Sequence, residues 1–232
     1  MTETWSFLES RPADAATNMA LDEALLRTAA ERGRPLLRLY SWEKPAVSFG
    51  YFQKFPVPLA DKYEIVRRST GGGLVYHGDG VDTTYAVVVP PEHRLYTMST
   101  ADAYGAIHKA VAAACELCSR ESQSCARVSD PAQSADRKSP EISRRSAVPP
   151  SARSGDLRTT LAAVPSLHKA QVASSRGQYE CFQKPDRGDV VVDGRKLAGA
   201  AQRRTKWGLL HQGSIAASVT AESLRRGFRR IL

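Results

Sequence analysis

Long apolar runs are missing from this sequence of 232 residues. None approaches the roughly 18 consecutive apolar residues that a membrane-spanning helix requires. The first fourteen residues, MTETWSFLESRPAD, lack the basic start and the apolar stretch of a secretory signal. We therefore expect a soluble, cytoplasmic protein that does not associate with membranes.

Cysteine is also scarce, with four residues in the chain: Cys115, Cys118, Cys125 and Cys181. Their number and spacing do not resemble a disulfide framework in a chain of this length. Cys115 and Cys118 form a CxxC pair, but no second pair follows at zinc-site spacing. Because the surrounding AVAAACELC has helical character, we interpret both as small helix residues and expect no metal site.

Aromatic residues are absent from residues 119–178, which instead contain thirteen serines and five prolines. Such a composition cannot bury enough apolar surface to offset the entropy lost on ordering. We expect a disordered insertion here, in which a short helix over 157–173 is possible but interrupted by Pro165. We therefore expect one domain, 1–232, whose ordered parts are 1–118 and 179–232.

The net charge of +9 has an uneven origin, because residues 119–178 contribute +5 of it. The remaining excess is small for a nucleic-acid-binding surface, so we do not expect a nucleic acid partner. A moderately basic surface suits an acidic protein partner instead.

Hydrophobic periodicity predicts several strands that follow one another without an intervening helix. Strands are expected within 35–52, 62–69, 73–77, 83–90 and 208–217, and 189–204 reads as a hairpin with an Asp-Gly turn. Helices are expected from Asn18 to Gly33, from a Thr100 cap to Cys118, and after Thr220. This order predicts an α+β fold: a mostly antiparallel mixed sheet, shared by the two ordered parts and flanked by helices.

The segment RRSTGGGLVYH, residues 67–77, places three glycines directly before a strand. Its spacing matches neither GxxxxGK[ST] nor GxGxxG, so neither familiar phosphate-binding loop is indicated. Glycine on a sheet face lets a ligand lie against bare backbone, but a tight turn or bulge needs glycine equally. The segment alone leaves both interpretations open.

Other candidate residues are equally open when taken singly. Lys196, beside Gly199 and Ala200, is able to hold a carbonyl or phosphate oxygen, or is a solvated lysine near a turn. Cys181 is a candidate nucleophile or a buried core residue. His77 and His211 are orienting groups or structural histidines, and no Ser-His-Asp spacing is readable.

Taken together, these motifs resemble the family of lipoate–protein ligases and octanoyltransferases, within the biotin/lipoate ligase fold. NMALDEALL, PLLRLYSWEKPAVSFGYFQ, RRSTGGGLVYH and DVVVDGRKLAGAAQRR with LLHQGSI match family segments in the same order. The resemblance implies a tunnel for an octanoyl or lipoyl chain, with Lys196 contacting the acyl carbonyl or the adenylate. It implies substrate-binding roles for Arg67, Arg68, Gly71, Gly72, Gly73, His77, Gly199, Ala201 and His211.

Two reactions are associated with the family. A transferase takes octanoyl from acyl carrier protein without a cofactor, and one branch carries the acyl group on a cysteine that is followed by Phe. Cys181-Phe182, upstream of Lys196, resembles that arrangement, and we favour it. The alternative is a ligase that uses ATP and Mg²⁺ through lipoyl-adenylate, because Gly188-Asp189 resembles a ligase segment whose Asp lies near the adenylate.

A non-catalytic lipoyl-binding homologue is a third possibility. The chain ends at Leu232 soon after these motifs, so we expect no C-terminal accessory domain of the kind that stand-alone ligases carry. The resemblance further implies that the acceptor is a lipoyl domain of an oxo-acid dehydrogenase or the glycine cleavage H protein.

Overall fold

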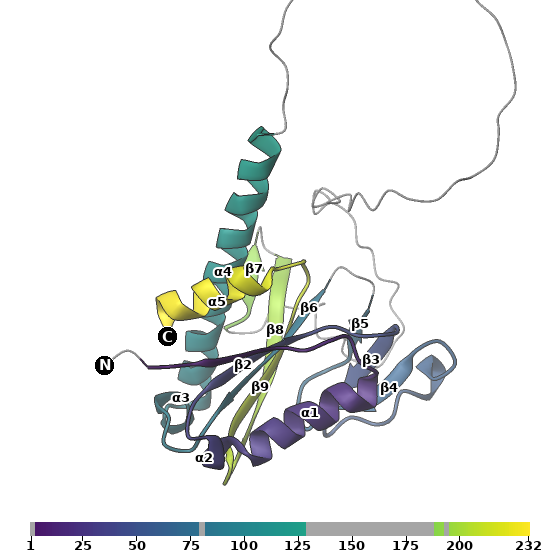
Figure 1. Cartoon of the computed structure of the whole chain (residues 1–232). Coiled ribbons are helices and arrows are strands. Elements are labelled where there is room, and N and C mark those ends of the chain that lie inside the picture. The colour runs from purple at the N-terminus through teal and green to yellow at the C-terminus, as the bar shows by residue number, and fades with distance from the viewer. Residues whose placement is uncertain (1–2, 79–81, 129–187, 193–194) are drawn as a thin grey trace, which may run out of the picture. The chain divides into compact units, whose positions relative to one another are not determined.

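A six-stranded sheet forms the centre of the fold in the computed structural model, which describes residues 3–78, 82–128, 188–192 and 195–232. Its strand order is β1 (Ser6–Glu9), β2 (Leu36–Tyr40), β6 (Thr83–Val89), β9 (Gly208–Ile215), β8 (Arg195–Thr205) and β7 (Val190–Val192) (Figure 1). Within this sheet, β1 and β2 pair in parallel, and the other neighbouring strands pair antiparallel. The predicted α+β fold is confirmed, and strands from both ordered parts of the chain share this sheet.

A second sheet has three strands, in the order β4 (Glu64–Arg67), β3 (Ala46–Phe49) and β5 (Val75–His77). The prediction of a single shared sheet was therefore wrong. Strand β3 pairs with β4 and β5 rather than with β2, its neighbour in sequence. Val47, Phe49 and Leu74 form a small apolar cluster that is separate from the main core. Because short strands need a shared apolar face, this cluster stabilises the three-stranded sheet.

Helices cover both faces of the large sheet. The side chains of β6 alternate: Tyr85 and Val87 join the core beneath α4 (Thr100–Val128) and α5 (Ala221–Ile231), whereas Ala86 and Val88 face α1 (Ala15–Arg27) and α2 (Ala29–Arg32). This period of two explains why every residue of β6 is buried. Two short helical segments, α3 (Arg94–Thr97) and η1 (Val57–Leu59), complete the described elements.

Two helix starts lie away from their predicted positions. Helix α1 begins at Ala15 because the Asp14 carboxylate accepts a hydrogen bond from the Thr17 backbone N–H at 2.8 Å. Helix α4 is capped by Ser99 rather than Thr100, since the Ser99 hydroxyl accepts from the backbone N–H of Asp102 at 3.1 Å. Thr220 caps α5 as predicted.

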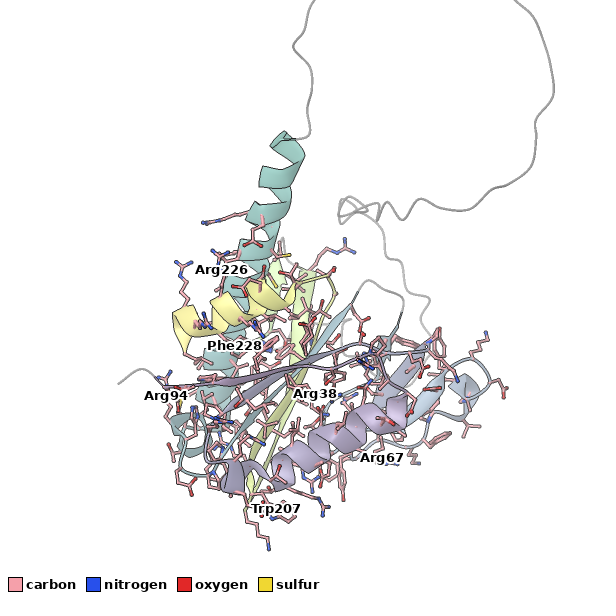
Figure 2. All side chains as sticks on the ribbon, viewed as in Figure 1. Arg38, Arg67, Arg94, Trp207, Arg226 and Phe228 are labelled. Carbon is pink, nitrogen blue, oxygen red and sulfur yellow. The ribbon has the colours of Figure 1, made fainter. Side chains whose placement is uncertain are left out.

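Helix α4 also continues ten residues beyond Cys118, where its end was predicted, and stops at Val128. Part of the reason lies at Glu121, whose carboxylate accepts hydrogen bonds from Ser223 and Arg226 of α5. In Figure 2, Arg226 of α5 lies beside α4, while Phe228 is buried in the core. The possible helix over 157–173 lies outside the described residues.

Cys115 and Cys118 occupy α4 as the sequence predicted, and both pack against the main core. Burial raises the pKa of Cys115 to about 12, so its thiol is protonated and unreactive at neutral pH. Among the described residues, no group of His, Cys, Asp and Glu side chains is arranged to hold a metal ion. No helix in this part of the chain is long and apolar enough to cross a membrane.

Candidate functional site

One pocket is lined by residues of both sheets. Its walls come from α1, β2 and β6, from β3 and β5 of the small sheet, and from β8 and β9 of the large one. The lining residues are Met19, Tyr40, Trp42, Ser48, Arg68, Val75, His77, Thr84, Gly199, Ala200, Ala201, Gln212, Gly213 and Ser214. Small residues dominate the wall made by β8 and β9, so a ligand there would lie against nearly bare backbone.

Lys196 lies directly over that wall. A Cβ atom on Gly199 would overlap the Cε and Nζ atoms of Lys196. The lysine is 5% exposed, and its Nζ lies 2.8 Å from the carboxylate of Asp189, which is 1% exposed. The Tyr104 hydroxyl of α4 donates to the same carboxylate at 2.6 Å. A buried ion pair thus holds the ammonium beside Gly199, although Lys196 and Asp189 are not themselves among the described residues that line the pocket.

A β-bulge explains how Lys196 reaches Gly199. Val190 pairs with Ala198, but the next residue, Val191, pairs with Lys196, so β8 carries one extra residue at this point. In a regular strand, residues three apart point to opposite faces. The extra residue brings the two onto one face, which is the way in which bulges re-aim side chains beside functional sites.

Arg68 shapes the glycine segment from beneath. It is 7% exposed and donates to the carbonyl oxygens of Gly71 at 2.9 Å and Gly73 at 2.8 Å. Its other nitrogen donates to Ser48 O and Ser48 Oγ, both at 2.8 Å. Four hydrogen bonds make Arg68 a clamp for the loop as well as a pocket-lining cation.

Of the two interpretations that the sequence left open for the three glycines, tight backbone geometry is the one that the structure shows directly. None of Gly71, Gly72 and Gly73 is among the described residues that line the pocket. Instead, the backbone of Gly72, at φ 89°, packs closely on Gly50. A Cβ atom on Gly50 would overlap the carbonyl oxygen of Gly72. The glycine run therefore permits close backbone packing. Arg68 links this run to the pocket, because it lines the pocket and donates to Gly71 and Gly73.

His77 faces the pocket from β5. Its Nε2 lies 2.7 Å from Ser48 Oγ and its Nδ1 lies 3.2 Å from Asp82 Oδ2, while its ring stacks on Trp42 at 4.1 Å. Burial lowers the pKa of His77 most, Asp82 opposes that effect, and Arg68 adds to it, so the imidazole is neutral at pH 7. The hydrogen bond with His77 helps to lower the pKa of Asp82, which is ionised.

His211 lies on the opposite face of β9. Its neighbours Gln212 and Ser214 face the pocket, and the period of two turns His211 toward α4. There its Nε2 lies 3.2 Å from the Tyr85 hydroxyl and its Nδ1 lies 2.9 Å from Gln202 Nε2. Burial first, and His108 second, hold its pKa well below the ordinary value. It supports the sheet behind the pocket.

The remaining predicted residues divide between the pocket and its surroundings. Ala201 lines the pocket. Arg67 is exposed and donates to the carbonyl oxygens of Tyr51 and Gln53, both at 2.7 Å, so it holds the loop after β3. Cys181 lies outside the described residues.

Several site residues were missed from the sequence, notably Ser48, Asp82 and Gln212. None of the three offered a local signal. The pairing of β8 with β9 is what puts Gln212, and not His211, opposite Ala201. Ser48 meets His77 only after β3 and β5 pair.

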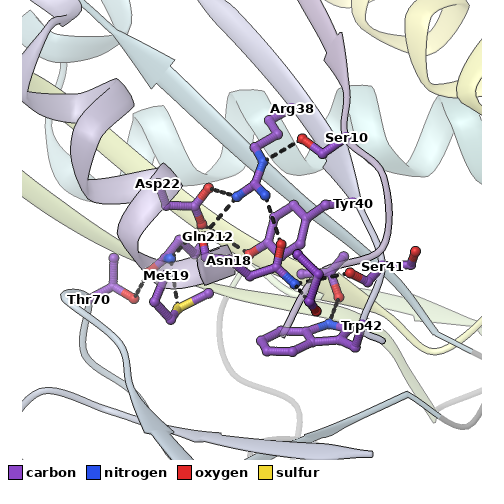
Figure 3. A network of polar contacts seen from close by, with 12 residues as sticks. Ser10, Asn18, Met19, Asp22, Arg38, Tyr40, Ser41, Trp42, Thr70 and Gln212 are labelled. Carbon is purple, nitrogen blue, oxygen red and sulfur yellow. Dashed lines mark hydrogen bonds and ion pairs between the residues drawn. The ribbon is translucent and has the colours of Figure 1, made fainter. Parts of the chain in front are cut away.

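A buried polar network connects the pocket to α1 (Figure 3). Arg38, fully buried, donates to the Asp22 carboxylate at 2.6 Å and to the Asn18 side-chain oxygen at 2.8 Å. Gln212 donates to the other Asp22 oxygen at 2.7 Å, and Tyr40 donates to it at 3.0 Å. Asn18 and Asp22 belong to the NMALDEALL segment, and these two polar residues point inward and hold the pocket wall.

Comparison with known protein families gives a match over most of the chain. The model of the lipoyl protein ligase A/B catalytic domain family matches residues 14–128 and 156–231. The chain belongs to this family, as its motifs indicated.

Among curated relatives, octanoyltransferase LipM of Oceanobacillus iheyensis is 32% identical over 97% of this chain and 68% of the relative. LipM of Staphylococcus aureus is 30% identical over 97% and 70%. Solved structures share the fold: lipoate-protein ligase A bound with ATP has a TM-score of 0.54 at 20% identity, covering 100% of this chain and 75% of that one. A bipartite lipoate protein ligase of Thermoplasma acidophilum has a TM-score of 0.55 at 17% identity, covering 99% and 82%.

Proposed function

We propose that this protein transfers an octanoyl group from acyl carrier protein to a lysine of a lipoyl domain. The observation that supports this most is the combination of LipM relatives over nearly the whole chain with a buried lysine held over a glycine and alanine wall. An apolar chain needs a groove with few side chains, and its thioester carbonyl needs a fixed positive charge. Lys196 is the residue assigned to the carbonyl.

The proposed nucleophile is the Cys181 thiolate. It would attack the carrier thioester, release the carrier thiol and hold the octanoyl group as a new thioester. The acceptor lysine, as a free amine, would then attack the enzyme-bound thioester, so that an amide forms and Cys181 is released. Because one thioester replaces another in the first step, no ATP, metal or other cofactor is required.

Arg68, His77, Gly199 and Ala201 are proposed to contact the acyl chain or its carbonyl, as lining residues of the pocket. Arg67, Gly71, Gly72, Gly73, Asp189 and His211 are proposed to act by shaping that site. The acceptor proteins proposed are the lipoyl domains of oxo-acid dehydrogenases or the glycine cleavage H protein, met by the basic surface of the chain.

The second candidate is an ATP- and Mg²⁺-dependent lipoate ligase. It is favoured by one observation, the shared fold with a ligase that binds ATP. In this reaction Lys196 would contact the adenylate and Asp189 would lie beside it. A binding protein without catalysis is the third.

Intact-mass measurement separates these functions. Wild-type protein mixed with octanoyl-acyl carrier protein in the absence of ATP should gain one octanoyl mass, and Cys181→Ser protein should gain none. Adding a lipoyl domain should move that mass to the domain. Pyrophosphate release from lipoate and ATP, with no octanoyl adduct, would establish the ligase instead. If the protein carried out neither reaction, the non-catalytic binding protein would be the remaining function.

A further inference from the structure

Three side chains form a hydrogen-bonded line that ends at the pocket. Ser48 Oγ lies 2.7 Å from His77 Nε2, and His77 Nδ1 lies 3.2 Å from Asp82 Oδ2. Ser48 comes from β3, His77 from β5, and Asp82 from the residue before β6. Ser48 is fully buried, His77 is 6% exposed, and both line the pocket.

The partners of this line fix the direction of its protons. Asp82 is an acceptor, so His77 donates from Nδ1 and its Nε2 is left as an acceptor. The Ser48 hydroxyl therefore donates to Nε2, because Arg68 already donates to Ser48 Oγ at 2.8 Å. Stacking on Trp42, whose indole N–H donates to Thr84 at 2.9 Å, holds the imidazole plane. The ring is ready to take a proton through Ser48.

The line faces the wall that contains Gly199, beside which the Lys196 side chain lies. Ser48 and His77 belong to the small sheet, whereas Gly199 belongs to the large sheet, and all three line one pocket. A thioester carbonyl held by Lys196 would therefore have the imidazole on the other wall. An incoming lysine side chain has to enter between them as an ammonium and must lose a proton before it can attack.

We propose that Ser48, His77 and Asp82 form a proton relay that deprotonates the acceptor lysine in the octanoyl transfer proposed above. The ammonium gives one proton to Ser48 Oγ as the Ser48 proton passes to His77 Nε2. The amine attacks the thioester carbon, its nitrogen loses a second proton to solvent, and the C–S bond breaks. The departing thiolate takes a proton from solvent, and His77 returns its proton to solvent through Ser48, so the relay returns to its starting state.

In this relay Ser48 and His77 are catalytic residues and Asp82 is a positioning residue that acts through His77. The neutral state of His77 is consistent with the role, because burial lowers its pKa. The carboxylate of Asp82 stabilises the imidazolium that forms. Arg68 keeps Ser48 in place without competing for the proton.

The test uses protein preloaded with octanoyl, whose loss of mass is followed with two acceptors. A lipoyl domain presents a protonated lysine and needs the relay, whereas hydroxylamine is already unprotonated at neutral pH. We expect His77→Gln, which keeps a hydrogen-bonding group near Ser48, to slow transfer to the lipoyl domain by about 100-fold or more. Its reaction with hydroxylamine should stay within about 3-fold of wild type, and KM for the domain should be unchanged. Ser48→Ala and Asp82→Asn should follow the same pattern, and Ser48→Thr should restore much of the rate.

His93→Gln is the matched control. His93 is 5% exposed and its Nε2 lies 2.9 Å from Glu3, so it is another buried histidine paired with a carboxylate, but it does not line the pocket. It should transfer to both acceptors at the wild-type rate. The relay would be overturned if His77→Gln slowed transfer to both acceptors equally. It would also be overturned if His77→Gln protein transferred octanoyl to the lipoyl domain at the wild-type rate. If the wild-type protein itself moved no octanoyl group, the proposed function would fall, and the relay with it.

Discussion

The Thr70 hydroxyl donates a 2.7 Å hydrogen bond to the side-chain oxygen of Gln212, which lies 142 residues further along the chain. Thr70 directly precedes the three glycines, Gly71 to Gly73, and Gln212 belongs to β9 of the large sheet. The amide of Gln212 continues to Asp22, and Asp22 to Arg38, as Figure 3 shows. The position of the glycine segment is thereby linked to a buried ion pair under α1.

Asp22→Asn should be strongly destabilising. It leaves the fully buried Arg38 without a counter-charge, which typically costs about 3–5 kcal/mol. Urea unfolding of wild-type and variant protein measures the difference. Glu23→Gln is the control, because Glu23 forms a partly exposed ion pair with Arg27 and should cost below about 1 kcal/mol. Equal losses from the two variants would contradict the buried network.

Gly50 and Gly71 should respond differently to alanine. A Cβ on Gly50 overlaps the backbone of Gly72, so Gly50→Ala has to displace the loop, with an expected cost of about 1–3 kcal/mol or more. Gly71 has no atom within 4 Å of the Cβ position. Gly71→Ala should therefore change the unfolding free energy by less than about 0.5 kcal/mol. Thermal and urea unfolding of both variants decide the matter.

Lys196→Ala should reduce octanoyl transfer by about 100-fold or more, because it removes the charge proposed to hold the acyl carbonyl. It should also destabilise the protein, since Asp189 is left buried without its cation. Adding Asp189→Asn should restore stability but not transfer. Recovery of transfer in the double variant would show that Lys196 serves only the ion pair.

Stability should fall as the pH drops from about 6.5 toward 4. Burial lowers the pKa of His108 to about 4, so the folded protein cannot take up the proton that the unfolded chain binds below the ordinary histidine pKa. His108 alone accounts for about 2 kcal/mol between pH 6.5 and 5. Burial shifts the pKa of His211 in the same direction. His108→Gln should flatten the pH dependence of the unfolding free energy, and an unchanged slope would count against this origin.

The chain between the two matched segments should be replaceable. The family model skips residues 129–155, which lie within the expected insertion. A short Gly-Ser linker in their place should leave octanoyl transfer within about 3-fold of wild type. A linker that starts at residue 119 removes Glu121 and its contacts with Ser223 and Arg226, so it should lower the melting temperature. Loss of transfer in a folded 129–155 replacement would contradict dispensability.

The sequence alone indicated the family and most of the elements, although it gave no sign of β1 and did not predict the division between α1 and α2. Apolar runs bounded by turn residues indicated the strands, Thr220 indicated the start of α5, and Gly33, at φ 64°, ends α2 where the end of the predicted helix was expected. These features depend on neighbours within a few residues, so they are readable without the fold. The family motifs are likewise contiguous segments, which is why they could be compared with known patterns directly.

Only the tertiary structure decided which side chains meet. The two-sheet division, the bulge that turns Lys196 over Gly199, and the line from Ser48 to Asp82 all depend on strand register. A shift of one residue in register turns a side chain to the other face, which is why Gln212 lines the pocket and His211 does not. Register is set by packing between segments far apart in the chain, and no local pattern encodes it.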